Sequence, residues 1–219
     1  MSLNIELARR NMVEQQVRPW DVLDARVLEA ISAIHREDFV PDACRNLAFA
    51  DLELPLGHAE VMMKPVVEGR MLQVVSPTGT ESVLEIGTGS GFVTACLARL
   101  ARAVVSIEQH ADFVDTARAR LAGAGLRNVR VEVAEAVYGF VPEQVFDVML
   151  VTGAVATLPP RWRDWVKPGG RLFAIVGASP VQRALLHARD ADGRWREEAM
   201  FETDLPYLNH AAPAARFAL

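Results

Sequence analysis

Beyond Pro77, short apolar runs alternate with stretches of helical pattern, and this alternation constrains the fold more than any other feature of the 219-residue sequence. Short apolar runs fit buried strands, whereas apolar residues recurring at helical spacing fit helices. The predicted strands are residues 82–86, 103–107, 129–133, 145–151 and 171–176. The predicted helices between them are residues 92–100, 111–122 and 160–166. Because strands and helices alternate, we expect an α/β fold with a parallel sheet and helices on both of its faces.

Further patterns flank this predicted sheet. On the N-terminal side, helical spacing predicts helices at residues 5–17, after the capping residue Asp24, and from Pro65 to about Val75. Residues 48–64 have mixed polarity and are predicted to form an irregular loop. On the C-terminal side, Pro168-Gly169-Gly170 is predicted to be the turn before the last parallel strand. Residues 182–189 and 194–201 flank Asp190-Ala191-Asp192-Gly193, which predicts an antiparallel hairpin at the sheet edge.

Charge and cysteine content exclude several classes of protein. A formal net charge of -5 provides no basic field for a phosphate backbone, so no nucleic-acid partner is expected. Cys44 and Cys96 are far apart, with no CxxC or histidine cluster nearby, so neither a disulfide framework nor a metal site is predicted. No apolar stretch fits a signal peptide or a membrane span, and we therefore expect a cytoplasmic protein that does not enter a membrane.

The run Gly87-Thr88-Gly89-Ser90-Gly91 joins the first predicted strand to the helix that begins at Phe92. Glycines let the backbone turn sharply and approach a ligand, although a tight strand-to-helix turn needs them for packing alone. In a dinucleotide-binding GxGxxG loop the third glycine would fall at position 92, which is Phe92 here. Glu85 opposes a diphosphate but suits the sulfonium and ammonium groups of S-adenosylmethionine (SAM). The loop therefore favours SAM over NAD.

Acids after the next two predicted strands extend this candidate cofactor site. Glu108 closes the second strand, where in this topology an acid accepts hydrogen bonds from both ribose hydroxyls. Glu135 follows the third strand and is expected to accept from the adenine amino group, with Gln109 and Ala136 lining the ring. An acid at a strand end is by itself usually a solvated charge, so the position of Glu108 behind the glycine loop carries this prediction.

Three stretches match motifs of a known enzyme family. They are residues 12–41, with Met12-Val13-Glu14-Gln15-Gln16-Val17-Arg18, Asp24-Ala25-Arg26-Val27-Leu28 and Arg36-Glu37-Asp38-Phe39-Val40-Pro41; residues 51–57, with Leu54-Pro55-Leu56-Gly57; and residues 83–91. In these stretches the chain resembles the protein-L-isoaspartate O-methyltransferases, and the resemblance covers roughly residues 7–177.

The resemblance implies a Rossmann-like, SAM-dependent methyltransferase fold, with a seven-stranded, mostly parallel sheet and an antiparallel edge hairpin. It implies methyl transfer from SAM to the α-carboxylate of an isomerised aspartyl residue in a protein or peptide, with S-adenosyl-L-homocysteine as the product. Residues 1–76 would then form an N-terminal helical extension with the acceptor loop, and residues 77–219 the SAM-binding core, within one compact domain. The cofactor roles implied are those of Glu85, Gly87, Thr88, Gly89, Gly91, Glu108 and Glu135.

The acceptor loop departs from the family pattern. Where the family continues Gly-Gln-Thr-Ile-Ser before a proline, this chain has Ala59-Glu60-Val61-Met62-Met63-Lys64-Pro65. Val61 stands at the Thr position and Met63 at the Ser position, and neither side chain donates a hydrogen bond. Lys64 or His58 would be the substitute donor. The family's Gly-Asp-Gly appears as Ala134-Glu135-Ala136, which keeps the carboxylate.

Three hypotheses about function stay open on the sequence alone. The chain is an isoaspartyl methyltransferase with a remodelled acceptor loop, a methyltransferase with a different protein or small-molecule acceptor, or a non-catalytic SAM-binding protein. An isoaspartyl carboxylate is ionised at neutral pH, so its methylation requires neither a general base nor a metal. A monomer is favoured, although the sequence does not determine the oligomeric state.

Overall fold

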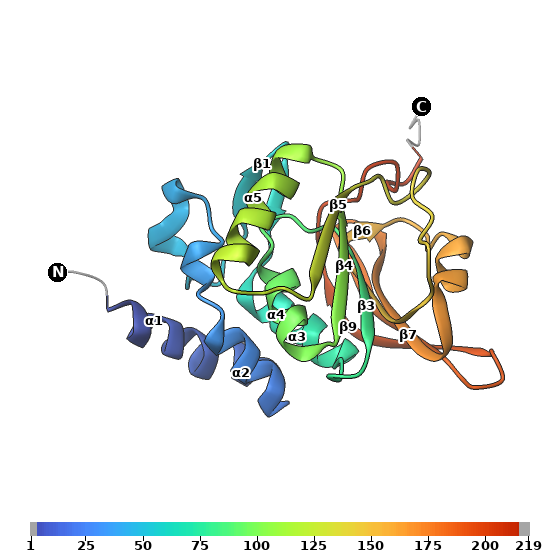
Figure 1. The fold of residues 1–219 in the computed structure, drawn as a ribbon, viewed down its shortest axis with the longest axis horizontal. Helices are drawn as coiled ribbons and strands as arrows, with labels where there is room; N and C mark the ends of the chain where they lie inside the picture. Colours follow the sequence, from blue (N-terminus) through green and yellow to red (C-terminus); the bar gives the residue numbers. More distant parts are fainter. Residues whose placement is uncertain (1–3, 215–219) are drawn as a thin grey trace.

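The computed structural model describes residues 4–214 and contains a seven-stranded sheet of order β5-β4-β3-β6-β7-β8-β9 (Figure 1). The strands from β5 to β7 run parallel, and β8 and β9 are antiparallel. The seven strands are β3 (Ser82–Ile86), β4 (Ala103–Glu108), β5 (Val129–Val133), β6 (Phe146–Val155), β7 (Val166–Ala178), β8 (Val181–Arg189) and β9 (Trp195–Thr203). The seven-stranded, mostly parallel sheet and its antiparallel edge hairpin are thus confirmed.

Strand β3 lies at the centre of the parallel part, between β4 and β6. All five of its residues are buried, as expected for a strand covered on both faces. From β3 the chain proceeds outward to β4 and β5 and then returns to the other side of β3 as β6. A crevice outside the carboxyl ends of the strands forms at such a change of direction, which places the candidate site beyond Ile86.

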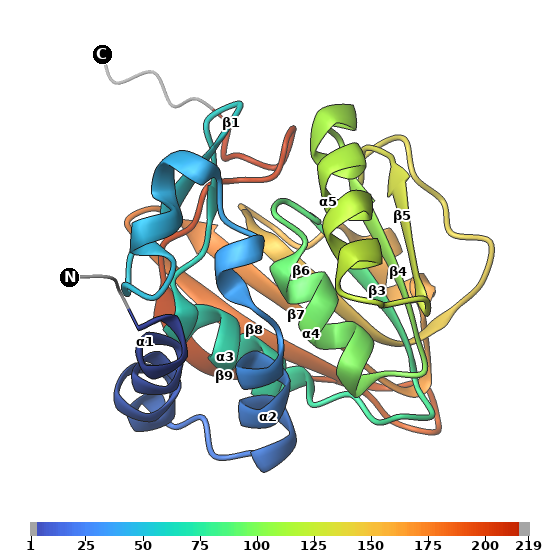
Figure 2. The ribbon, with the colours of Figure 1, turned by 60° about the vertical axis from the view of Figure 1, so that its left-hand side comes forward.

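One face of the sheet is covered by helices α3 (Pro65–Val75), α4 (Phe92–Leu100) and α5 (Ala111–Gly123), whose apolar side chains share one core with the sheet (Figure 2). The N-terminal helices α1 (Ile5–Asn11) and α2 (Ala25–Ala33) form an outer layer in which α2 packs on α4. Asp24 caps α2, because its Oδ1 accepts from the backbone N–H of Arg26 at 2.9 Å. The predicted helix at residues 5–17 is one helical stretch in which α1 continues into a π-helix, η1 (Met12–Val17).

The opposite face is covered differently from our prediction of helices on both faces. Residues 160–166 were predicted to be helical, and they contain only a short 3-10 helix, η5 (Pro160–Trp165). Trp162 and Trp165 of this turn pack with Phe146 and Leu172 in a second core. The two indole rings therefore contribute to covering this face in place of a regular α-helix.

Residues 48–64 are not the irregular loop that their polarity indicated. They contain the antiparallel hairpin of β1 (Leu54–Gly57) and β2 (Glu60–Met62). The turn is formed by His58 and Ala59, which both adopt positive φ values of 52° and 63°. The residues that normally indicate a tight hairpin turn at these positions are Asn and Gly, and this chain has neither there. Upstream of the hairpin lie the 3-10 turns η2 (Arg18–Trp20), η3 (Arg36–Asp38) and η4 (Asp42–Leu47).

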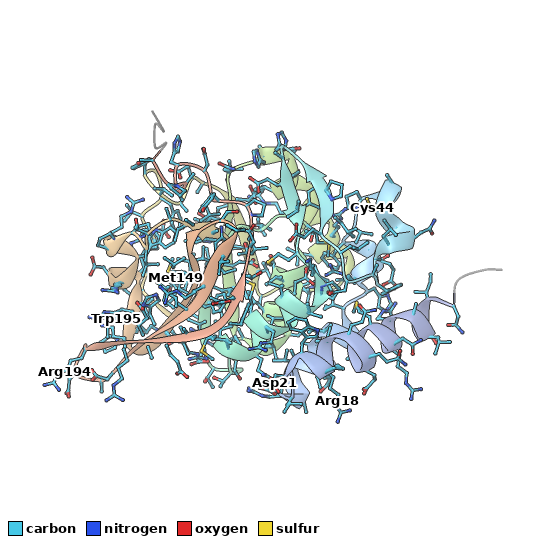
Figure 3. The ribbon with its side chains drawn as sticks, turned by 180° about the vertical axis from the view of Figure 1, so that it is seen from behind. Arg18, Asp21, Cys44, Met149, Arg194 and Trp195 are labelled. Atoms are coloured by element: carbon cyan, nitrogen blue, oxygen red, sulfur yellow. The ribbon has the colours of Figure 1, made fainter. Side chains whose placement is uncertain are left out.

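The segment Pro168-Gly169-Gly170 is also placed differently from the prediction. It lies inside β7 rather than before it, at an irregularity in the pairing of β7 with β6. A Cβ at Gly170 would lie 2.6 Å from the carbonyl oxygen of Asp147, so the glycine permits the close approach of the two strands. The predicted edge hairpin is present as β8 and β9, with Arg194 and Trp195 at its outer end (Figure 3).

Among residues 4–214, no helix is long and apolar enough to cross a membrane. The predicted N-terminal part, residues 1–76, begins with residues 1–3, and the predicted core, residues 77–219, ends with residues 215–219. Both of these short terminal stretches lie outside the described residues.

Candidate active site

A cavity lies at the carboxyl ends of β3, β4, β5 and β6, where the change of direction in the sheet predicts a crevice. Its walls come from the glycine loop, the ends of β4 and β5, the β1–β2 hairpin and the segment after β9. The lining residues include Leu56, Glu60, Val61, Met62, Met63, Glu68, Gly87, Thr88, Gly89, Val93, Glu108, Gln109, Glu135, Ala136, Thr152, Gly153, Leu208 and Asn209.

The glycine loop has the geometry that its sequence predicts. Gly87, Gly89 and Gly91 all have positive φ values, of 96°, 51° and 86°. A Cβ on Gly87 would lie 2.3 Å from the hydroxyl of Thr152, and that hydroxyl donates to the carbonyl of Gly87 at 2.6 Å. A side chain at Gly87 is therefore excluded both by the backbone conformation and by the neighbouring Thr152. Gly87, Thr88 and Gly89 line the cavity, whereas Gly91 begins α4 behind it.

Glu85 is not among the described residues that line the cavity, which differs from the prediction of direct contact with a cationic ligand. Its side chain is fully buried, and one carboxylate oxygen accepts from the hydroxyls of Thr94 and Ser106. The other oxygen has no hydrogen-bond partner among residues 4–214. Burial raises the pKa of Glu85 to about 7, against the effect of the two hydroxyl donors. This carboxylate joins β3, β4 and α4 beneath the loop.

Glu108, the predicted ribose ligand, lies at the cavity wall. One oxygen accepts from the backbone N–H of Gly89 at 3.0 Å, and the other accepts from the N–H of His110 at 3.1 Å. Each carboxylate oxygen can accept a second hydrogen bond, so acceptor capacity remains toward the cavity. Gln109 follows it in the wall, and its amide donates to Nε2 of His110 at 3.1 Å.

Glu135 and Ala136, the predicted adenine contacts, line the cavity beyond β5. The Glu135 carboxylate accepts from the backbone N–H groups of Val137, Tyr138 and Gly139, at 2.7, 2.7 and 3.2 Å. Burial opposes ionisation of this group, but the three backbone donors outweigh it and hold the pKa of Glu135 below its usual range. The carboxylate is therefore charged and fixed at neutral pH.

The part of the cavity formed by the predicted acceptor loop is apolar, because Val61 and Met63 stand there in place of the hydroxyl residues of the family pattern. Val61 and Met63 both line it, together with Met62, whereas Lys64 is not among the lining residues within 4–214. His58, the other suggested donor, is also absent from the described lining; it is exposed at the hairpin turn. Neither suggested substitute for the missing hydroxyls reaches the cavity.

A buried ion pair behind this wall was missed by the sequence analysis. Arg36 pairs with Glu68, and its guanidinium also donates to the carbonyls of Met63 and Ala48, both at 2.8 Å. Glu68 lines the cavity, and burial raises its pKa to about 7 while Arg36 opposes the rise. The available signal was a single acid within the otherwise apolar start of α3.

The segment after β9 was also missed as part of the site. Leu208 and Asn209 line the cavity, and the N–H of Leu208 donates to the carbonyl of Ala154 at 2.9 Å. Tyr207 forms a bridge with Ala154 at the end of β6. This stretch has no periodicity, so its attachment to the sheet had no local sequence signal.

The sheet order, the edge hairpin and the glycine loop beside the cavity together define a Rossmann-like methyltransferase. The family model described as protein-L-isoaspartate(D-aspartate) O-methyltransferase (PCMT) matches residues 8–205. The chain belongs to this family.

Individual relatives and structures agree with that assignment. The protein-L-isoaspartate O-methyltransferase of Syntrophus aciditrophicus is 40% identical over 174 residues, covering 80% of each chain. That of Ectopseudomonas mendocina is 37% identical over 201 residues, covering 91% of this chain and 95% of the relative. A Plasmodium falciparum structure described under the same enzyme name, in complex with S-adenosyl-L-homocysteine, superposes with a TM-score of 0.79. It covers 95% of this chain and 99% of its own at 15% identity, and therefore supports the fold.

The buried position of Glu85 predicts how stability depends on pH. Because its folded pKa is raised from 4.5 to about 7, the folded state takes up a proton more readily than the unfolded chain. Protonated Glu85 therefore adds to the free energy of unfolding. This stabilisation is complete below the ordinary pKa of 4.5 and disappears as the pH rises to about 7, a change of about 3 kcal/mol. Glu85→Gln removes the titrating group, so its unfolding free energy will fall less steeply than wild type between pH 4.5 and 7.

Urea unfolding followed by circular dichroism at pH 4.5 to 8 measures this difference. Other acids, Glu68 included, contribute to both proteins and cancel when the two curves are subtracted. Glu143→Gln, at a side chain that is 86% exposed, is the control and should follow the wild-type curve. If the unfolding free energies of Glu85→Gln and wild type change in parallel with pH, the raised pKa of Glu85 is refuted.

Proposed function

We propose that this chain transfers the methyl group of SAM to the free α-carboxylate of isoaspartyl residues in proteins or peptides. Membership of the PCMT family over residues 8–205 is the observation that carries the proposal. The cavity beside the glycine loop supports it, because the family's cofactor requires a crevice at this position of the sheet.

The cavity residues fit SAM. Gly87 and Gly89 form a cradle that side chains would fill, which permits close approach of a ligand to the backbone. We assign the ribose hydroxyls to the remaining acceptor capacity of Glu108, and the adenine amino group to Glu135 beside Gln109 and Ala136. Glu85 supports the loop from beneath instead of contacting the cofactor.

When bound, SAM supplies an electrophilic methyl group on a sulfonium. The transfer requires in-line alignment of the acceptor oxygen, and the acceptor carboxylate is already ionised. No general base is therefore needed. We propose that the hairpin residues Leu56, Val61 and Met62 exclude water from the acceptor side of the cavity. Arg36 holds the carbonyl of Met63 and is thus a positioning residue for the acceptor wall.

A second candidate is a methyltransferase with a different acceptor. The observation that favours it is the apolar acceptor wall, because Val61 and Met63 offer no donor to a substrate carboxylate. A buried carboxylate without a partner is costly, so such a wall suits a less charged acceptor, such as a small molecule. The two candidates share the cofactor site and differ only in the acceptor.

The remaining parts of the proposal concern the setting of the reaction. We propose a monomer that acts in the cytoplasm on protein or peptide acceptors. Cys44 and Cys96 are both free, which fits a reducing compartment. The net charge of -5 is unfavourable for binding nucleic acid.

Transfer from tritiated SAM tests the function. We expect label in a peptide that contains one isoaspartyl residue and none in the same peptide with a normal aspartyl residue. S-adenosyl-L-homocysteine binding is measured on the same preparation by calorimetry. Binding without label in either peptide would favour the second candidate or a non-catalytic SAM-binding protein.

Restoring the hydroxyls should strengthen isoaspartyl transfer. Val61→Thr combined with Met63→Ser adds two donors at the acceptor wall, and a well-placed donor in a desolvated site contributes up to roughly 10²-fold to rate. We expect a higher kcat/KM on the isoaspartyl peptide and an S-adenosyl-L-homocysteine affinity within about twofold of wild type. Val61→Thr with Met62→Ser makes the same chemical change one residue away and serves as the control.

Shortening a buried methionine also leaves space, so both double variants are first checked by thermal melting. An equal gain in the two variants, or no gain in a folded Val61→Thr/Met63→Ser protein, would count against a carboxylate acceptor at this wall.

Loss of the Glu108 carboxylate should weaken cofactor binding. Hydrogen bonds to a charged acceptor contribute about 1.5–3 kcal/mol, so Glu108→Ala should bind S-adenosyl-L-homocysteine roughly tenfold to a hundredfold more weakly. Asp115→Ala, at a side chain of α5 that is 82% exposed, is the control and should match wild type. Calorimetry measures both, with NAD expected to give no saturable binding. An unchanged affinity in Glu108→Ala would refute its ribose role.

A further inference from the structure

Two histidines and an aspartate meet beside the mouth of the cavity. His58 lies at the tip of the β1–β2 hairpin, while His110 lies just before α5 and Asp112 in its first turn, and the contact between His58 and Asp112 brings the two segments together (Figure 1). Each of the three offers one ligand atom, and these atoms all lie within 4.8 Å of one another. Because His58 is distant in the sequence from His110 and Asp112, no sequence motif predicted a metal site here.

The side chains in this cluster are mutually oriented. The rings of His58 and His110 are stacked, with centroids 4.1 Å apart and an angle of 9° between their planes. Nε2 of His58 lies 3.1 and 3.2 Å from the two carboxylate oxygens of Asp112. The Phe113 ring packs in a T-shaped arrangement with both imidazoles, with centroids 5.3 and 5.2 Å away, and so supports the pair.

The chemistry of the cluster fits a transition-metal ion. Nε2 of His110 accepts from the amide of Gln109, so this nitrogen is unprotonated and has the lone pair that a metal ligand requires once that hydrogen bond is exchanged. One oxygen of Glu60 lies 3.8 Å from the same nitrogen and brings a further carboxylate to the site. Two neutral imidazoles with a carboxylate form a ligand set typical of Zn²⁺, whereas Mg²⁺ prefers oxygen ligands alone.

We propose that His58, His110 and Asp112 bind a Zn²⁺ ion, with Glu60 or water as the fourth ligand. The ion connects the tip of the acceptor hairpin to the start of α5. This proposal is independent of the acceptor and of methyl transfer, because it rests only on the placement of the three side chains.

Such an ion would stabilise two walls of the cavity at once. On one side, Leu56 of the hairpin lines the cavity, and its Cδ1 lies 3.3 Å from the position of a Cβ on Gly89. On the other side, the backbone N–H of His110 donates to Glu108. Zn²⁺ should therefore increase the affinity for S-adenosyl-L-homocysteine, by about fivefold or more if the coupling is typical, and the ligand should increase Zn²⁺ affinity by the same factor.

Calorimetric titration of ZnCl₂ into the untagged, metal-free full chain tests the site. We expect saturable binding of one ion per chain, with MgCl₂ giving no saturable heat. His110→Ala and His58→Ala should each weaken the Zn²⁺ affinity by at least about tenfold, because each removes one of three protein ligands.

His35→Ala is the matched control. Nδ1 of His35 lies 3.7 Å from an Asp38 oxygen at an exposed position, so it provides a histidine and aspartate pair without the second imidazole. Its Zn²⁺ affinity should equal that of wild type. Thermal melting without metal checks the folding of each variant, and Asp112→Asn, at a side chain that is 64% exposed, provides an additional ligand variant.

Two results would overturn the proposal. If Zn²⁺ does not bind saturably, or binds the folded His110→Ala, His58→Ala and Asp112→Asn variants as tightly as wild type, the cluster is a surface hydrogen bond. If Zn²⁺ binds but leaves the S-adenosyl-L-homocysteine affinity unchanged, the ion does not connect the cavity walls. Both measurements proceed without an acceptor, so they remain informative even if isoaspartyl transfer fails.

Discussion

The candidate site depends on a buried carboxylate beneath the glycine loop. Glu85 accepts from Thr94 on α4 and Ser106 on β4, and Ser106 also bonds the hydroxyl of Thr88 at 2.6 Å. The network thus joins the loop, two strands and a helix within an apolar core. Polar groups buried in a low-dielectric interior are costly unless they are bonded, so this network specifies one arrangement of the elements around the loop. The proposed cofactor site at Gly87 and Gly89 relies on that arrangement.

A second buried acid, Glu68, lies behind the proposed acceptor wall and also joins distant segments. Glu68 pairs with Arg36, and Arg36 also holds the carbonyls of Met63 and Ala48. Its guanidinium lies 4.8 Å from the centroid of the Phe92 ring, at the start of α4. The N-terminal segments are thereby attached both to the acceptor wall and to the helix that follows the glycine loop. The two sides of the cavity share α4 as their common support.

Local patterns predicted the elements whose own residues determine them. The strand Ser82–Ile86 and the helix Pro65–Val75 have the bounds that apolar runs and a helix-initiating proline predicted. The β1–β2 hairpin was missed because His58 and Ala59 adopt positive φ without the usual turn residues. The same limit applies to the site: the predicted positions of Glu108 and Glu135 follow from strand ends, whereas the contacts of Glu85, Glu68 and Leu208 depend on distant segments. Their placement became visible only in three dimensions.

The attachment of Leu208 has a consequence for the order in which the molecule is made. Domains generally fold as units during synthesis, so a single domain needs all of its segments before its fold is complete. All seven strands and the glycine loop precede Leu208 and Asn209 in the sequence, yet these two residues form part of the cavity wall. Because the last strand ends only five residues before Leu208, the sheet edge and this side of the crevice become available together. The crevice is complete only once translation has passed the last strand.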